Sequence, residues 1–475
     1  MGFVDTPGAS PKPNSRSRRG RLGTRIGLRR PAGVAAAVGA AKTGARVGLL
    51  EAAGCLGGAA TMRNVLTYCG LCTLGEQPRQ AVAGVADEIM AKLRRWAAVT
   101  PPMRHRGVFV IFDPEAVKRA LDEVCAAAGV DILLHAFVFR GDREDNAVAR
   151  LRFAGHSGEH QLEAKGFVDA SGDCDLAFFA GASTRYGNSG AVNLGTLGTR
   201  FGGIASEADV SAETVTDAIK KAKARGVHPI SRDRSIIARL PLSGDVVAYL
   251  ASEDYDPRDV HSVSRAEISG RAQAWTYLEI LKELPGWRHA YLASTGPEFG
   301  TRESRHINSV EQLTWQHVTE GRRAEDCVAL GSWGVEWHDR ETFDSSFVYP
   351  PNGGTYDIPL GCLRSVDTPN LFAAGRTADG DRQAGASLRV MGTAFATGQA
   401  AGVAAACHAR GGHLESAEVR RVLASQGALL DPADTGDRGS SARNAQRDRI
   451  PAAGAIGSSE GANARRRQRP SAFSV

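Results

Sequence analysis

The sequence predicts an α/β fold with a central parallel sheet, and two stretches far apart in the chain carry that prediction. Residues 31–51 contain a helix of small residues, a glycine turn and a buried strand that ends in an acid. Residues 371–406 contain a short apolar strand, a glycine-rich polar loop and a helix with Gly and Ala on one face. In residues 184–349 the alternation of strands and helices is no longer apparent, and aromatic and charged residues are more frequent. We therefore expect one α/β unit with an inserted α+β unit.

The first stretch has the pattern of the second half of a βαβ unit that binds a dinucleotide. Gly33 takes the place of the third glycine of a Gly-x-Gly-x-x-Gly loop, and Glu51 follows where an acceptor for a ribose hydroxyl is expected. The first half of the unit departs from the pattern, because Leu28 and Arg30 stand where the first two glycines belong. The residues before them do not form a convincing apolar strand. We expect this strand to be absent or replaced, for example through a reading-frame change.

The second stretch predicts a ligand site at the start of its helix, near Met391. A helix start offers free N–H groups and a partial positive charge, which suit an anionic or electron-rich ligand. Gly398 and Gly402 lower the helix propensity of this segment. We expect close packing of another backbone against these glycines to offset that loss.

The sequence AAGRT at residues 373–377, followed by SLRVMGTAFATGQAAGVAAA at 387–406, resembles the C-terminal flavin-contacting segment of the FAD-dependent oxidoreductase family. These flavoproteins have a glutathione-reductase-like fold and are distantly similar to the fumarate reductase and succinate dehydrogenase flavoproteins. The resemblance covers about residues 31–426. It implies a Rossmann-like FAD-binding domain with a β-meander and an inserted substrate domain. The expected domains are 26–183 with 350–426 for FAD and 184–349 for the substrate, between disordered basic tails at 1–25 and 433–475.

The resemblance also implies which residues contact FAD. The Leu-Gly-Gly turn after Glu51, the Asp-Ala-Ser-Gly-Asp turn at 169–173 and the start of the last long helix are similar to segments that follow the cofactor in the family. The expected FAD-binding residues are Gly33, Glu51, Gly57, Gly58, Thr61, Ala170, Gly172, Asp173, Gly375, Arg376, Arg389, Val390, Met391 and Gly392.

Besides Arg389 at the start of the last long helix, catalytic candidates come from two motifs in residues 184–349. GTRESRHI at 300–307 resembles a family motif in which two arginines flank Glu303; Arg302 is then either a carboxylate ligand for the substrate or one member of an internal Arg–Glu–Arg pairing, which is the commoner use. His338, with Asp339 beside it, is a candidate for proton transfer, and His306 is a weaker one. The predicted catalytic residues are His338, Arg302 and Arg389.

Cys69 and Cys72 leave an alternative open, because a dithiol at this place would suit a disulfide reductase. No second cysteine pair completes a zinc site, and no metal is expected. A further alternative is a flavin-free member of the family, since the first glycine loop is altered. The main hypothesis is an FAD-dependent oxidoreductase that transfers a hydride between a small organic substrate and flavin N5.

The net charge of +6 does not indicate nucleic-acid binding. Residues 1–30 carry +7 and residues 436–475 carry +5, which leaves the remainder at −6. No nucleic-acid motif accompanies the basic ends, and no apolar run is long enough to span a membrane. The eight cysteines are dispersed, which favours a reducing compartment, and we expect a cytoplasmic protein. A transit-type leader stays open because the N-terminus is rich in arginine.

Overall fold

The fold is α/β, as the sequence predicts. The structure is a computed structural model that describes residues 26–27 and 31–435. The expected tail at 1–25, the altered loop at 28–30 and residues 436–475 lie outside the described part. The first residues of the expected C-terminal tail belong to a short 3-10 turn, η4, at Pro432–Thr435.

A five-stranded parallel sheet forms the base of the first unit. Its strand order is β21-β10-β1-β2-β6, so the strand nearest the N-terminus lies in the middle. The two residues of β1 pair with both neighbours, Gly27 opposite Asp169 and Ile26 opposite Leu49. A short strand therefore occupies the place where the sequence predicts an absent or replaced one. The strands are β1 Ile26–Gly27, β2 Gly48–Leu50, β6 Asp131–Leu133, β10 Phe167–Asp169 and β21 Leu371–Ala373.

A separate antiparallel sheet, β7-β8-β9, forms the predicted β-meander between β6 and β10. Its strands are β7 Phe137–Glu144, β8 Ala147–Gly155 and β9 Gly158–Glu163. The apolar residues at 130–139 and at 161–170 each predict one continuous strand from the sequence, and the structure contradicts both predictions. In each case the chain leaves one sheet for the other, and the first break contains His135 with a φ of 54°.

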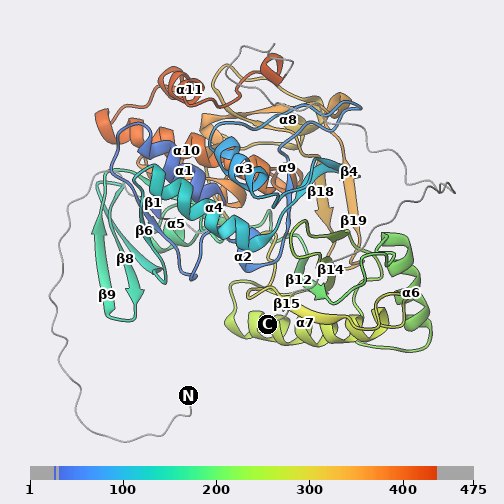
Figure 1. Ribbon diagram of the computed structural model, residues 1–475. Helices are drawn as coiled ribbons and strands as arrows, with labels where there is room; N and C mark the ends of the chain where they lie inside the picture. Colours follow the sequence, from blue (N-terminus) through green and yellow to red (C-terminus); the bar gives the residue numbers. More distant parts are fainter. Residues whose placement is uncertain (1–25, 28–30, 436–475) are drawn as a thin grey trace, which may run out of the picture.

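Helices α1, Pro31–Ala41, and α10, Met391–Gly411, pack side by side in the centre of the molecule (Figure 1). A Cβ atom added to Gly398 would lie 2.2 Å from the carbonyl oxygen of Ala32, and one added to Gly402 would lie 2.0 Å from that of Ala36. The backbones thus touch at the two glycines. The predicted close packing is confirmed.

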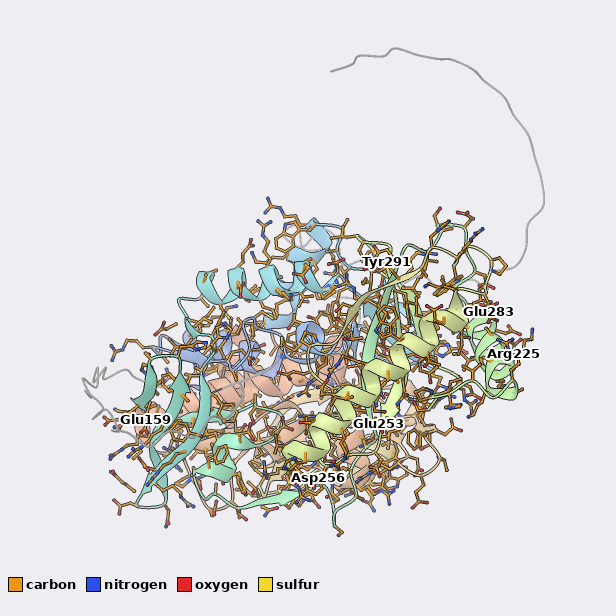
Figure 2. All side chains as sticks on the ribbon, turned by 90° about the horizontal axis from the view of Figure 1, so that it is seen from below. Glu159, Arg225, Glu253, Asp256, Glu283 and Tyr291 are labelled. Atoms are coloured by element: carbon orange, nitrogen blue, oxygen red, sulfur yellow. The ribbon has the colours of Figure 1, made fainter. Side chains whose placement is uncertain are left out.

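The inserted unit is built on a four-stranded antiparallel sheet of order β13-β14-β12-β15, with α6 and α7 beside it (Figure 1, lower right). Buried side chains of the sheet and of both helices form their own core, which includes Phe201, Tyr277 and Trp287. Arg225 and Glu283 lie next to each other at the ends of the two helices (Figure 2), with nitrogen–oxygen distances of 2.9 and 3.0 Å. The elements are β12 Gly195–Gly202, α6 Ala212–Ala224, β13 Ile237–Arg239, β14 Val246–Glu253, α7 Val260–Leu281 and β15 Tyr291–Thr295.

The remaining helices and turns connect and cover these sheets. Asp113 caps α4 by accepting a hydrogen bond from the backbone N–H of Glu115. Helix α9 was not predicted, and it lies in the loop expected to be polar and irregular. The elements are α2 Ala59–Met62, α3 Val85–Arg95, α4 Pro114–Ala127, α5 Asp175–Phe179, α8 Trp315–Glu320, α9 Arg382–Leu388, α11 Ser416–Ser425, η1 Pro351–Gly353, η2 Leu360–Leu363 and η3 Gly375–Thr377.

Small sheets complete the fold between the two units. The three-stranded one is β3-β5-β4, and three two-stranded ones follow. Their strands are β3 Thr67–Cys69, β4 Met103–His105, β5 Gly107–Ile111, β11 Thr184–Tyr186 with β16 Arg305–Ile307, β17 Cys327–Gly331 with β20 Tyr356–Pro359, and β18 Val335–His338 with β19 Ser345–Val348. Among the described helices none is by itself both long and apolar enough to cross a membrane; α9 and α10 reach that mark only as a pair bent by 91°.

The contact between α1 and α10 predicts a large difference between two Gly→Ala substitutions in one helix. Gly402→Ala should lower the free energy of unfolding by about 1–3 kcal/mol, because its methyl group would overlap the Ala36 carbonyl. Gly411→Ala meets no atom within 4 Å and should be neutral or slightly stabilising. Chemical denaturation of both variants measures the difference. Equal stability of the two would contradict the close contact.

Candidate functional site

A cavity of about 510 Å³ lies where the first unit meets the inserted one. The start of α10, the segment 300–302 and strand β18 form its inner part. The loop before β13, the side of α6 and the turn between β4 and β5 form the outer part. The lining contains eight Arg or Lys side chains against four Asp or Glu. The cavity is therefore positively charged overall.

Helix α10 begins at the cavity with residues that the sequence singled out. Arg389, Val390 and Met391 all line it. Val390 is the N-cap and provides no side-chain hydrogen bond to the first turn, so the helix start depends on other groups for its N–H donors. Gly392 does not line the cavity; a Cβ there would lie 2.4 Å from the carbonyl oxygen of Cys69. Gly392→Val would thus disrupt packing on β3, whatever it did to a ligand.

Four polar side chains form an inner charged group: Arg302, Glu336, His338 and Arg389. The imidazole Nε2 of His338 lies 3.5 Å from Oε1 of Glu336. Arg389 donates a hydrogen bond to the Glu336 carbonyl oxygen at 2.9 Å, and its guanidinium is 3.9 Å from the carboxylate. Two of the buried polar atoms, His338 Nδ1 and Arg389 Nε, have no partner among the described residues. All three predicted catalytic residues therefore come together at the cavity, around an acid that the sequence did not indicate.

Arg302 does not belong to the internal Arg–Glu–Arg pairing that the sequence favoured. It donates hydrogen bonds of 2.6 Å to the Leu194 carbonyl oxygen and to Thr196 Oγ1, and it lines the cavity. Burial lowers the pKa of Arg302 to about 9, and repulsion from Arg389 and Arg232 adds to that effect. The alternation of side chains explains the correction, because neighbouring residues of an extended segment point to opposite sides.

The acid of the same motif, Glu303, serves a separate buried network. Its carboxylate accepts hydrogen bonds from the backbone and the side chain of Asn193, and it lies 3.2 Å from His306 Nε2. The other ring nitrogen of His306 lies 3.0 Å from the Ala378 carbonyl oxygen. Asn193 in turn accepts a hydrogen bond from the backbone N–H of His338. His306 is therefore buried in a network that holds β18 in place.

The surroundings of His338 keep its imidazole neutral. Burial is the largest effect and Arg302 the next, and together they lower the pKa of His338 to about 3, against the smaller raising effect of Glu336. The pKa of Glu336 also falls well below its usual range: burial is the largest single effect and opposes this, but His338 and the two arginines outweigh it. The expected partner Asp339 instead accepts hydrogen bonds from the backbone of residues 341 and 342. Glu336, and not Asp339, is the carboxylate beside His338.

A second group of predicted residues meets at the neighbouring wall. Arg376 lines the cavity and binds Asp173 at 2.6 Å, and it also donates to the Thr301 carbonyl oxygen. Gly375, with a φ of 65°, lies against α1 and α10 and donates its N–H to Thr397 Oγ1 at 3.1 Å. The turn that holds Ala170 and Gly172 follows β10 directly, and Asp169 orders it by accepting from the N–H of residues 171 and 177.

The other predicted cofactor residues lie away from the cavity lining, near the end of β2. Glu51 is buried directly after that strand, and Gly33 is buried in the first turn of α1. Thr61 donates to the Leu56 carbonyl oxygen at 2.7 Å, and a Cβ on Gly57 would lie 2.7 Å from its methyl group. Gly58 caps α2 with a φ of 50°. Which of these residues contact FAD stays a prediction.

Cys69 and Cys72 are free, and the structure gives neither the character of a reactive thiol. Burial raises the pKa of each thiol to about 12. Cys69 lines the cavity, whereas Cys72 does not. A reductase needs a thiolate near neutral pH, so these environments disfavour the dithiol alternative. Within the described residues no group of three or more His, Cys, Asp and Glu side chains has the arrangement of a metal site.

The sequence analysis missed most of the cavity lining, including the charged residues Arg63, Arg232 and Glu336. Arg63 binds Glu298 through two hydrogen bonds of 3.0 and 3.2 Å. Glu336 lies two positions before the candidate histidine on a short strand, and that spacing, which places both side chains on one face, is the signal that was available. Nothing in the sequence around Arg232 distinguishes it from other loop arginines.

The low pKa of His338 predicts a pH-dependent loss of stability. Between about pH 3 and ~6.5 the unfolded chain binds a proton at this residue and the folded protein does not, so stability falls as the pH falls through this window and is unaffected above it. His338→Asn removes this contribution. The difference in unfolding free energy between wild type and variant should shrink by roughly 2 kcal/mol from pH 7.5 to pH 4.5. Denaturation at both pH values measures it, and an unchanged difference would refute the low pKa.

The high thiol pKa values predict slow chemistry at both cysteines. In the native protein at pH 8, Cys69 and Cys72 should react with an alkylating reagent far more slowly than a free thiol, because only about one in 10⁴ is ionised. Peptide mass spectrometry against time measures the rates, with unfolded protein as the reference. Rapid modification of either cysteine in the native state would restore the dithiol alternative.

Comparison with known proteins agrees with the motifs. The model of the family described as FAD dependent oxidoreductase matches residues 30–426. No curated protein matches. Similar solved structures include BexE, studied for oxidation during BE-7585A biosynthesis, with 15% identity and a TM-score of 0.44 over 86% of this chain and 66% of that one.

A geranylgeranyl bacteriochlorophyll reductase-like protein from Thermoplasma acidophilum has 12% identity and a TM-score of 0.44, over 86% of this chain and 83% of that one. The flavin-dependent brominase Bmp2 has 13% identity and a TM-score of 0.45, over 85% and 83%. The chain thus spans just under two thirds of BexE and more of the other two. At such identities these structures say nothing about its substrate. The match over residues 30–426 shows that this chain belongs to the FAD-dependent oxidoreductase family, whose cofactor is FAD.

Proposed function

We propose that this chain transfers a hydride between a small organic substrate and N5 of FAD, within the cavity at the start of α10. The observation that carries the proposal is the meeting of His338, Arg302 and Arg389 at one cavity next to that helix start. FAD, when bound, supplies the two-electron carrier. The protein supplies orientation, positive charge and a proton acceptor.

The described residues fit the cofactor at its flavin end. The N-terminus of α10 presents its partial positive charge to the cavity, which suits the electron-rich edge of a flavin ring. Arg389 adds a buried guanidinium whose Nε has no partner among the described residues. We propose that the Glu51 carboxylate, at the end of β2, receives the ribose hydroxyl of the same ligand. The parallel sheet and the β-meander also support a glutathione-reductase-like course for the bound dinucleotide.

His338 is suited to act as a general base. Its Nε2 faces the Glu336 carboxylate, which fixes the proton of the neutral ring on that nitrogen and leaves a lone pair on Nδ1. The pKa of about 3 keeps the ring unprotonated near neutral pH but also makes it a weak base, and a ligand that offsets the repulsion from Arg302 would raise this pKa. As the hydride leaves the substrate, Nδ1 accepts the proton that the substrate loses. Arg302, fixed by its hydrogen bonds to residues 194 and 196, orients the substrate.

The first test is the flavin content of the purified protein. We expect a yellow protein that releases close to one FAD per chain on denaturation, measured by absorbance and chromatography. A colourless protein that takes up no added FAD would instead support the flavin-free alternative.

The second test addresses proton transfer. His338→Asn should keep its FAD and lose a factor of about 10² to 10⁴ in the rate at which substrate reduces the flavin, because no base then receives the proton. Anaerobic stopped-flow absorbance measures this rate after a panel of small hydroxy acids, alcohols and amines has identified a reductant. His413→Asn, at a histidine side chain that is 82% exposed, is the matched control and should be unchanged. Undiminished reduction in His338→Asn would exclude the assigned role.

A further inference from the structure

We propose that Arg232, together with Arg302, binds an anionic group of the substrate, so that the substrate of this enzyme is an organic anion such as a carboxylate or a phosphate ester. The inference rests on the proposed function, in that it takes the cavity as the substrate site. It adds a residue and a substrate class that the family match does not assign.

The backbone of Arg232 is fixed, while its guanidinium has no hydrogen-bond or ion-pair partner in the part of the chain that the structure describes. The hydroxyl of Tyr277 on α7 accepts a hydrogen bond from the Arg232 N–H at 2.9 Å and donates one to its carbonyl oxygen at 2.7 Å. The side chain is half-buried and lines the cavity, and within the described residues it makes no ion pair or hydrogen bond. Arg234, two positions on, is exposed and pairs with Asp344 at 3.0 Å. Both arginines line the cavity, but only Arg234 is paired with an acid among the described residues.

The charges around Arg232 do not balance. Arg302 lies near enough to Arg389 and to Arg232 for each to lower its pKa, and Glu336 is the carboxylate that acts on all three arginines. Asp344 acts more strongly than Glu336 on Arg232, but it is already paired with Arg234. His338 is neutral. Burial lowers the pKa of Arg232, with Asp344, Tyr277 and Glu336 as weaker opposing effects. Buried charges are costly unless they are paired, so an excess of two positive charges favours an anionic ligand.

Arg232 lies in the inserted unit, on the side of the cavity where we place the substrate, and not at the helix start where we place the cofactor. Arg389 belongs to the start of α10, whereas Arg232 comes from the loop between α6 and β13 of the inserted unit. Between these walls the lining includes the apolar faces of Tyr249, Trp333 and Phe347. A molecule with an apolar body and one anionic end would contact the aromatic side chains with its body and the arginines with its charged end. Guanidinium groups bind carboxylate and phosphate oxygens in a bidentate manner.

The experiment measures anion binding directly and does not require turnover. Benzoate, succinate, inorganic phosphate and the neutral benzamide are titrated into the full chain by calorimetry, with and without FAD. At least one anion should bind to wild type, and its dissociation constant should rise at least about tenfold in Arg232→Gln. Arg232→Lys should recover part of that loss. Arg225→Gln, at an exposed arginine seven positions upstream that pairs with Glu283, is the matched control and should bind as wild type does.

Each outcome decides the proposal. Absence of anion binding in wild type, equal affinity in Arg232→Gln, or benzamide binding as tightly as benzoate would overturn it. A preference for phosphate over both carboxylates would assign the substrate as a phosphate ester, and the reverse would assign it as a carboxylate. FAD content of Arg232→Gln should equal that of wild type, because Arg232 lies on the substrate wall. If the anion binds through Arg232 but no substrate reduces the flavin, the proposed hydride transfer fails and the anion site stands.

Discussion

The contact of α1 with α10 is the constraint on which the rest of the arrangement depends. At Gly398 and Gly402 the two backbones approach to a distance at which no side chain fits between them. Helix α1 connects β1 to β2 in the N-terminal part of the chain, and α10 follows β21 in the C-terminal part. Their contact therefore joins strands of one parallel sheet that are far apart in the sequence. It also fixes where α10 begins. Gly392 then rests on the backbone of β3, and residues 389–391 face the cavity.

The cavity shows how stability and chemistry compete in this protein. A buried group of three arginines with one carboxylate is a poor way to stabilise a fold, since unpaired buried charge costs free energy. The protein holds it in place through other contacts: a carbonyl oxygen and a threonine hydroxyl for Arg302, the Tyr277 hydroxyl for the Arg232 backbone, and the Asn193–Glu303–His306 network for β18. The charged side chains are therefore held in position by bonds that do not neutralise them. Such an arrangement is what a site prepared for a charged ligand requires.

Much of the fold could be predicted because the signals were local. The acid and proline at the start of α4, the spacing of glycines along α10 and the acid at the end of β2 each indicate their structure within a few residues. The break between β6 and β7 could not be found in this way, since it depends on which sheet each half joins. Helix α9 had a local signal that was missed: Asp381 caps it, accepting from residues 383 and 384.

The site was harder to predict than the fold, for a physical reason. The three catalytic candidates line one cavity, but their partners depend on tertiary contacts between elements far apart in the chain. The side chains of Arg302 and Glu303 have different partners, and the carboxylate beside His338 is that of Glu336 and not that of Asp339. The compartment and the domain limits stay predictions.

The loop that carries Arg232 bears on how substrate specificity changes among related enzymes. It belongs to the inserted unit and has no part in the parallel sheet. Hydrogen bonds of Ser231 and Ser235 to β14, and of the Arg232 backbone to the Tyr277 hydroxyl, hold it in place. On the proposal that Arg232 binds the substrate, variation in this loop would exchange one class of substrate for another and leave the cofactor-binding unit unchanged. Directed evolution of a new specificity should begin at these few positions, where diversity is least harmful to the rest of the molecule.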